Sequence, residues 1–233
     1  MLNAMLRSVS KSNISATYIG FVDGGSPSGT GTPAGVASNT YTFSNVNIGG
    51  PGLIVFGISA EGSTSAYSLN SLTVNGNSAT QVTNTTFFGG NYATSAIFQN
   101  VVASGTTANL VITFSGTVQR TRISVWRVQN YSNATSISSN TATAASGTGL
   151  SVTLTSMQVG SAVIGIYTTG TAVSHTWTNL TEKFDSTIAG SSGGADTQAS
   201  GAVNIILSSS NLLVRTSNSS SSQATILTAA AWI

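Results

Sequence analysis

The sequence predicts an all-β protein, a jelly-roll-like β-sandwich of about fourteen short strands. Turn residues recur about every 8 to 12 positions, and the runs between them are rich in Val, Ile, Thr, Phe and Tyr, which is typical of a sandwich or barrel. No sustained helical period of 3.6 residues occurs in either half of the chain. Ser, Thr, Gly and Asn make up about half of the 233 residues, yet 40% of the chain is apolar, so we expect it to fold rather than remain disordered.

The N-terminal residues differ from the rest. Leu2, Met5, Leu6 and Val9 occupy helical spacings i, i+3, i+4 and i+7, which predicts a short amphipathic stripe. A helix of about ten residues is marginal alone. The alternatives are a frayed terminus or an arm that becomes ordered on a partner, and we expect residues 1–22 to form an attachment arm in which 14–22 adds one strand.

A linker is expected over residues 23–39, because this stretch holds five glycines and two of the three prolines without any hydrophobic period. The predicted strands then follow in order. In the run 108–114 apolar residues alternate with polar ones, which is the period of a strand with one buried face. The Asn75-Gly76 pair predicts a tight type I′ turn. The strands expected in the first half are 41–48, 53–60, 69–75, 79–87, 94–101, 108–114 and 121–128.

The body, residues 40–233, contains two pseudo-repeats, 40–131 and 150–233. The sequence from Thr42 to Gly49 is echoed from Thr153 to Gly160, and each echo is followed by an apolar run containing glycine. Each half would carry about seven strands. The two halves can form one large sandwich or two tandem small ones, and the absence of proline between them favours one packed unit.

Charge and cysteine content exclude several functional classes. Only 5% of residues are charged, too few for the basic face that a nucleic-acid-binding protein needs. There is no cysteine, which excludes disulfides, thiolate nucleophiles and cysteine zinc sites. We expect no secretion signal, because the first residues have no positive region ahead of an apolar run of about 7 to 15 residues. We expect no membrane partner, because no apolar stretch reaches about 18 residues.

Catalytic groups are scarce. His175 is the single histidine, no Gly-x-Ser-x-Gly motif occurs, and we expect His175 to be a packing or surface residue. Glu182 and Asp185 could contribute to a weak calcium site but are better explained as surface charge at a turn. We therefore expect no enzyme, no cofactor and no metal.

Arg120, Arg122 and Arg127 form the one basic cluster. In an extended strand Arg120 and Arg122 point the same way as Trp126, which predicts either a stacking or carboxylate-binding patch or a charged edge strand. We expect the edge or subunit-contact role. The candidate partner-binding residues are Leu2, Met5, Leu6, Val9, Arg120 and Arg122.

Several β-strand segments with fixed glycines resemble small structural proteins of tailed-bacteriophage virions. They are residues 41–49, 53–58, 72–80, 106–116 and 177–185, within a region of about residues 40–190. The resemblance implies a non-enzymatic particle component, expected as a capsid decoration, cement or knob-like protein. It would be a homo-oligomer that binds the major capsid protein or other virion proteins and is located in the virion. The alternatives are a tail or fibre-associated protein, or a carbohydrate-binding adhesin that stacks sugars on Trp126, Trp177, Tyr92 or Tyr131.

Overall fold

The computed structural model is all β, which confirms the predicted fold class. It describes residues 13–24, 37–62, 65–188, 197–207, 210–220 and 222–233, and within them it contains sixteen strands and no helix. Leu2, Met5, Leu6 and Val9 lie outside the described residues. A search of the described residues for a helix long and apolar enough to cross a membrane finds none.

The first half forms one antiparallel sheet organised around the 23-residue strand β8. The end of β8 pairs with β1 and β3, and β3 continues to β7 and β6. The start of β8 pairs with β2 and β4, so the sheet curls over a core of its own. The strand bounds are Ser15–Gly24 (β1), Ser38–Asn47 (β2), Gly52–Gly62 (β3), Leu69–Val74 (β4), Asn77–Ser78 (β5), Thr80–Phe88 (β6), Tyr92–Val102 (β7) and Thr107–Gln129 (β8).

The second half forms two sheets. One has the order β13-β14-β11-β16-β9 and the other the order β10-β15-β12. The strand bounds are Ser138–Gly147 (β9), Ser151–Leu154 (β10), Ala162–Thr169 (β11), His175–Thr178 (β12), Thr181–Ile188 (β13), Thr197–Ile205 (β14), Leu212–Asn218 (β15) and Ser222–Trp232 (β16).

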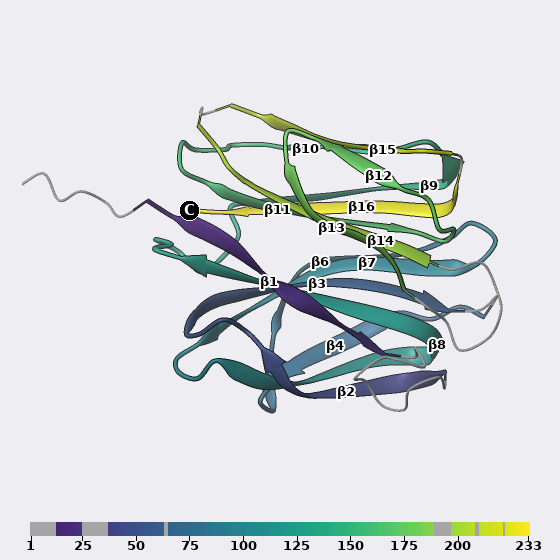
Figure 1. Cartoon of the computed structure of the whole chain (residues 1–233), viewed down its shortest axis with the longest axis horizontal. Helices are drawn as coiled ribbons and strands as arrows, with labels where there is room; N and C mark the ends of the chain where they lie inside the picture. The colour runs from purple at the N-terminus through teal and green to yellow at the C-terminus, as the bar shows by residue number, and fades with distance from the viewer. Residues whose placement is uncertain (1–12, 25–36, 63–64, 189–196, 208–209, 221) are drawn as a thin grey trace, which may run out of the picture.

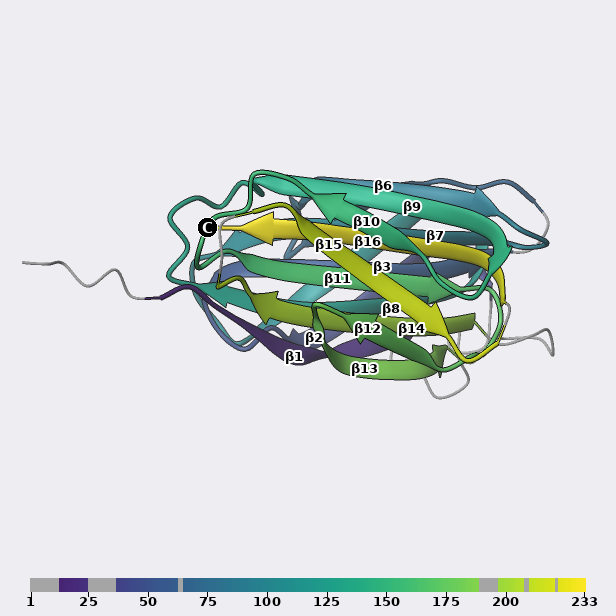
Figure 2. The same ribbon diagram turned by 90° about the horizontal axis from the view of Figure 1, so that it is seen from above.

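These sheets stack as layers, with β2 and β4 at one end and β10, β12 and β15 at the other (Figure 1). One apolar core lies inside each half, and a third lies between the halves, where Val55 and Trp126 meet residues such as Ile164 and Trp232. Viewed from above, β3 and β7 run beneath β11 and β16 (Figure 2). The inner strands are therefore buried on both faces, which explains why β3 and β11 read as continuous apolar runs instead of alternating ones.

The two halves repeat the same topology. The order β6-β7-β3-β8-β1 in the first half matches β13-β14-β11-β16-β9 in the second, and β2-β8-β4 matches β10-β15-β12. The loops agree in detail, since Asn45 and Ser156 both have positive φ near 60° and are each followed four residues later by a positive-φ glycine, Gly49 or Gly160. The predicted duplication is present, with eight strands in each half instead of about seven.

The strand expected over residues 14–22 is present, whereas strands also occur in stretches that were expected to be linker or connection. Strand β1 extends from Ser15 to Gly24 and pairs with β8, so the second part of the expected arm and the start of the expected linker belong to the sheet. Strand β2 begins at Ser38, inside the expected linker. Strand β9 lies in the expected connection between the repeats. These strands were difficult to predict for two reasons. They contain glycine or serine, which obscure a strand pattern, and the strands that they pair with are far away in sequence.

Candidate functional site

Arg122 lies at the centre of a buried polar cluster that joins the two halves. Its Nε is 2.6 Å from Oδ1 of Asp23, and one terminal nitrogen is 2.7 Å from Oδ2, which makes a bidentate ion pair between β8 and β1. The guanidinium also donates to the backbone carbonyls of Ser186 and Thr187 on β13, at 3.1 and 3.2 Å. The ring of Phe21 covers it at 3.8 Å. One side chain thus connects three strands from both halves.

Arg120 makes a second, fully buried connection. Its Nε lies 3.1 Å from a carboxylate oxygen of Glu61 on β3, and both side chains are 1% exposed. A terminal nitrogen donates to the carbonyl of Ile188 at 3.1 Å. Glu61 also accepts from the amide of Asn91 and from the hydroxyl of Thr197. Because a buried charge is tolerated only when it is paired and hydrogen-bonded, this network holds β13 and β14 firmly on β3 and β8.

The structure contradicts the prediction that Arg120 and Arg122 bind a partner from an edge strand. Both residues are almost completely buried, and β8 lies between β1 and β3. Their side chains do point the same way as Trp126, as expected, but that direction is toward the second half of the chain. They are structural residues that fasten the halves together.

His175 and Asp185 form a third buried polar group. Nδ1 of His175 lies 2.9 Å from Oδ1 of Asp185, and the backbone N–H of His175 donates to Oδ2 at 2.8 Å. The amide of Gln198 donates to Asp185 as well. Burial alone would raise the pKa of Asp185, but these hydrogen bonds outweigh it and hold the pKa below its usual value. The expectation of a packing histidine agrees with its 4% exposure, whereas Asp185 is not the free surface charge that we expected.

The arrangement around His175 resembles the order of a nucleophile, base and orienting acid. The hydroxyl of Thr169 is 3.3 Å from Nε2 of His175, opposite Asp185. Thr169, however, is completely buried, and its hydroxyl donates to the carbonyl of Thr171 at 2.9 Å. A nucleophile must reach its substrate, so the described geometry serves packing. Among the described residues no group of three or more His, Asp or Glu side chains could hold a metal ion.

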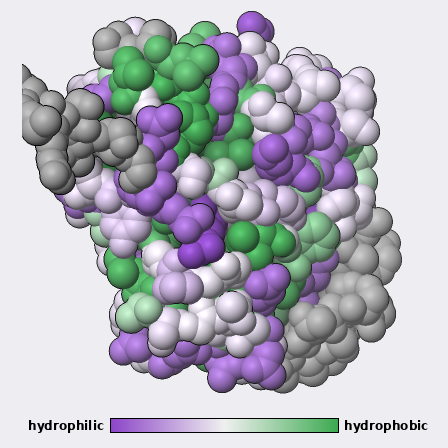
Figure 3. Space-filling view, turned by 60° about the vertical axis from the view of Figure 1, so that its left-hand side comes forward, coloured by the Kyte–Doolittle hydropathy of each residue, from purple (hydrophilic) through white to green (hydrophobic). Residues whose placement is uncertain are grey.

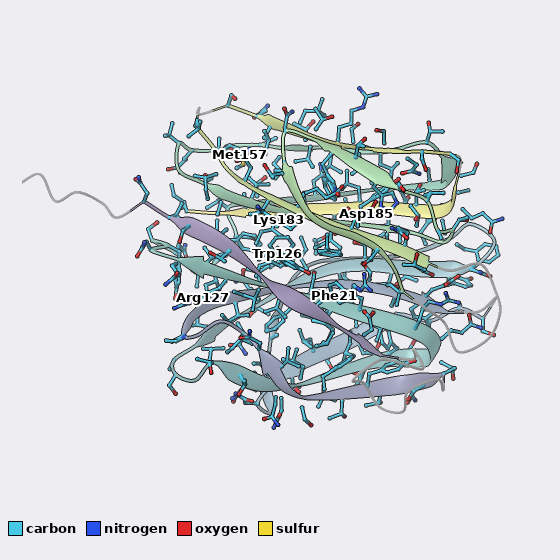
Figure 4. The ribbon with its side chains drawn as sticks, in the orientation of Figure 1. Phe21, Trp126, Arg127, Met157, Lys183 and Asp185 are labelled. Carbon is cyan, nitrogen blue, oxygen red and sulfur yellow. The ribbon has the colours of Figure 1, made fainter. Side chains whose placement is uncertain are left out.

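The aromatic residues considered for sugar stacking do not form a platform. Trp126 is completely buried between the halves (Figure 4). Trp177 is partly buried, and its Nε1 donates to Ser200 at 2.7 Å. Tyr131 packs against the core between the halves, and Tyr92 packs against Phe88 with ring centroids 4.8 Å apart. The adhesin alternative therefore cannot rest on these four rings acting together.

The described part of the outer surface carries very little charge. Among the ionisable Asp, Glu, Lys and Arg side chains of the described residues, the exposed ones are Glu182, Lys183 and Arg215. Arg127 donates to the carbonyls of Gly49 and Pro51 and is only partly exposed. Figure 3 shows apolar and hydrophilic side chains interspersed on one face. Such a surface has little long-range electrostatic repulsion between copies.

Asp23 and Glu61 are the site residues that sequence reasoning missed. Each lies far from its arginine in sequence, and Asp23 and Arg122 are 99 positions apart. One signal was available, because Glu61 follows an apolar run in a chain with only five acidic residues. A carboxylate that continues a buried apolar run is expected to have a buried partner, because Asp and Glu are almost never fully buried unless they are paired.

Comparisons with known proteins find no relative. No family model matches the chain, and neither a curated protein nor a solved structure gives a significant match.

Proposed function

We propose that this chain is a non-enzymatic structural protein of a tailed-bacteriophage virion, attached to the capsid exterior as a decoration, cement or knob-like subunit. The single observation that carries the proposal is the distribution of charge. The described chain buries Arg120, Arg122 and Glu61 inside the body and leaves a nearly uncharged surface. Proteins with little net surface charge associate readily, which suits a subunit of an assembly.

The rigidity of the body also supports a structural role. Its inner strands are buried on both faces, and the arginine clusters tie the two halves together. Interactions buried in this way are screened little by salt. A particle component exposed to variable ionic strength benefits from that property, and the chain has no cysteine to be oxidised.

The resemblance of residues 41–49 and 177–185 to small virion proteins gives the proposal its biological setting. The proposed partners are the major capsid protein or other virion proteins, and further copies of this chain in a homo-oligomer or lattice. The sparse charge argues against nucleic acid as a partner.

A reconstitution experiment tests the proposal. Purified protein is added to phage capsids that lack it, and bound protein is measured by co-sedimentation, with an unrelated all-β protein of similar size as control. We expect saturable binding with a fixed number of copies per capsid. Binding to isolated tails and not to capsids would contradict the capsid location, and binding to neither would contradict the virion function.

A further inference from the structure

A groove of about 450 Å³ opens on the outer three-stranded sheet of the second half, away from the Arg120 and Arg122 clusters between the halves (Figure 1). It lies between the β9–β10 turn and β15. The residues lining it are Thr148, Gly149, Leu150, Ser151, Leu213, Arg215, Thr216 and Ser217. The close approach of the turn depends on Gly149, because a Cβ at this position would lie 2.2 Å from the carbonyl oxygen of Thr216.

Arg215 is the charged residue among those that line this groove. Arg120, Arg122 and Arg127 all donate to carboxylates or carbonyls. Arg215 is exposed and has neither an ion pair nor a side-chain hydrogen bond with the described residues. In a chain that engages its other described arginines, an open guanidinium on a groove wall indicates an anionic ligand.

Hydroxyl groups surround this guanidinium. Strand pairing places Ser151 and Thr178 on either side of Arg215. Ser151 and Thr148 make no side-chain hydrogen bond within the described residues, so their hydroxyls are available. Leu213, two residues from Arg215 on the same face, is 47% exposed and supplies an apolar contact.

The duplication provides an internal comparison. Matching the loops at Asn45 and Ser156 aligns Phe43 with Leu154. Phe43 pairs with Leu110 and Leu154 pairs with Leu212, so Leu110 and Leu212 are also equivalent. The position equivalent to Arg215 is therefore Thr113 in the first half. Thr113 shares a hydrogen bond of 2.7 Å with Ser71 and carries no charge. The two outer faces thus share hydroxyl-rich flanks and differ in the cation, which the fold itself does not require.

We infer that this groove binds a carboxylated sugar, a residue with a carboxylate on a hydroxylated ring. The guanidinium would bind the carboxylate through two parallel hydrogen bonds. Thr148 and Ser151 would bind ring hydroxyls, and Leu213 would contact the apolar face of the ring. A single cation suits a carboxylate better than a nucleic acid, which needs several phosphate contacts. This inference does not rest on the proposed virion function, since it concerns the isolated protein.

The test is an NMR titration of the full chain with a galacturonic acid trisaccharide and, separately, with N-acetylneuraminic acid. The matching neutral galactose trisaccharide and a short polyglutamate peptide serve as comparison ligands. We expect saturable shifts at the amides of Ser151, Arg215 and Ser217 with at least one acidic sugar. The sugar that binds distinguishes a uronic acid source from a sialic acid source.

Two variants distinguish binding in the groove from a general attraction of anions to positive charge. Arg215→Thr installs the residue of the equivalent position and should fold normally, and we expect it to weaken binding at least about tenfold, as loss of a charge-assisted hydrogen bond does. Lys183→Gln removes another exposed cation and should bind as the unaltered protein does. Binding by neither acidic sugar, equal binding of the polyglutamate peptide or the neutral sugar, or unchanged binding by Arg215→Thr would overturn the inference.

Discussion

Ile166 of the second half packs directly onto Gly57 of the first half. A Cβ on residue 57 would lie 2.2 Å from Cδ1 of Ile166 and 2.5 Å from the hydroxyl of Ser124. The close contact between β3 and β11 therefore requires a residue without a side chain at this position. The halves meet there as tightly as two layers of one domain.

Replacing Gly57 tests this contact. We expect Gly57→Ala to lower the free energy of unfolding by about 1–3 kcal/mol, because the added methyl group overpacks a closed core. Chemical denaturation measures the change. Gly147→Ala is the control, since no atom lies within 4 Å of a Cβ placed there. Adding Ile166→Ala to Gly57→Ala should cost less than the sum of the single changes, and strict additivity would show that the two residues do not share this space.

Breaking the Asp23–Arg122 pair should be costly. Asp23→Ala leaves a guanidinium that is 2% exposed without its carboxylate, and removal of one partner of a buried ion pair costs about 3–5 kcal/mol. The double variant Asp23→Ala, Arg122→Met should be more stable than Asp23→Ala alone. Urea denaturation compares both with Lys183→Gln. If Asp23→Ala is as mild as Lys183→Gln, the pair does not join the halves as described.

Stability should fall in alkali through Tyr18. Burial between the halves, opposed by Arg122 and assisted by Asp23, raises the pKa of Tyr18 to about 12. The unfolded chain ionises this phenol near pH 10, so its contribution is complete below pH 10 and is lost as the pH rises toward 12. Tyr18→Phe should have a shallower loss of unfolding free energy between pH 9 and 11.5. Identical slopes in the two proteins would contradict the raised pKa.

Two truncations separate the N-terminal residues from strand β1. Deleting residues 1–12 should leave the melting temperature of the body unchanged and abolish binding to capsids if these residues are the attachment arm. Deleting residues 1–22 removes most of β1 and should lower the melting temperature as well, because β8 loses a paired neighbour and Trp126 loses the ring of Tyr18, 4.8 Å away. Full capsid binding by the shorter deletion would show that the attachment surface lies on the body.

Local signals predicted much of the fold. The alternation over 108–114 matches the start of β8, and Asn75-Gly76 forms the predicted turn with both φ values positive, 51° and 80°. The duplication was visible because the sequence from Thr42 to Gly49 is echoed from Thr153 to Gly160. These features depend on neighbouring residues, which a single sequence displays.

Contacts between strands that are far apart in sequence could not be predicted from such local patterns. The direction of Arg120 and Arg122 was predicted correctly, but their environment depends on β13, more than 60 residues away. Strand β1 was only partly predicted, because its pairing partner, β8, follows a hundred residues later. The groove at Arg215 requires a turn and a strand that are separated by about 65 residues. Charge in a strand therefore indicates an edge only when no second sheet covers it.

The most direct test of the virion function is a cryo-electron microscopy reconstruction of particles produced by the phage that encodes this chain. The account predicts ordered density for the sixteen-stranded body on the outside of the capsid, at symmetry-related positions, and its loss from particles made without the chain. Particles from which the protein is absent, or in which it occurs only inside the head, would contradict the account.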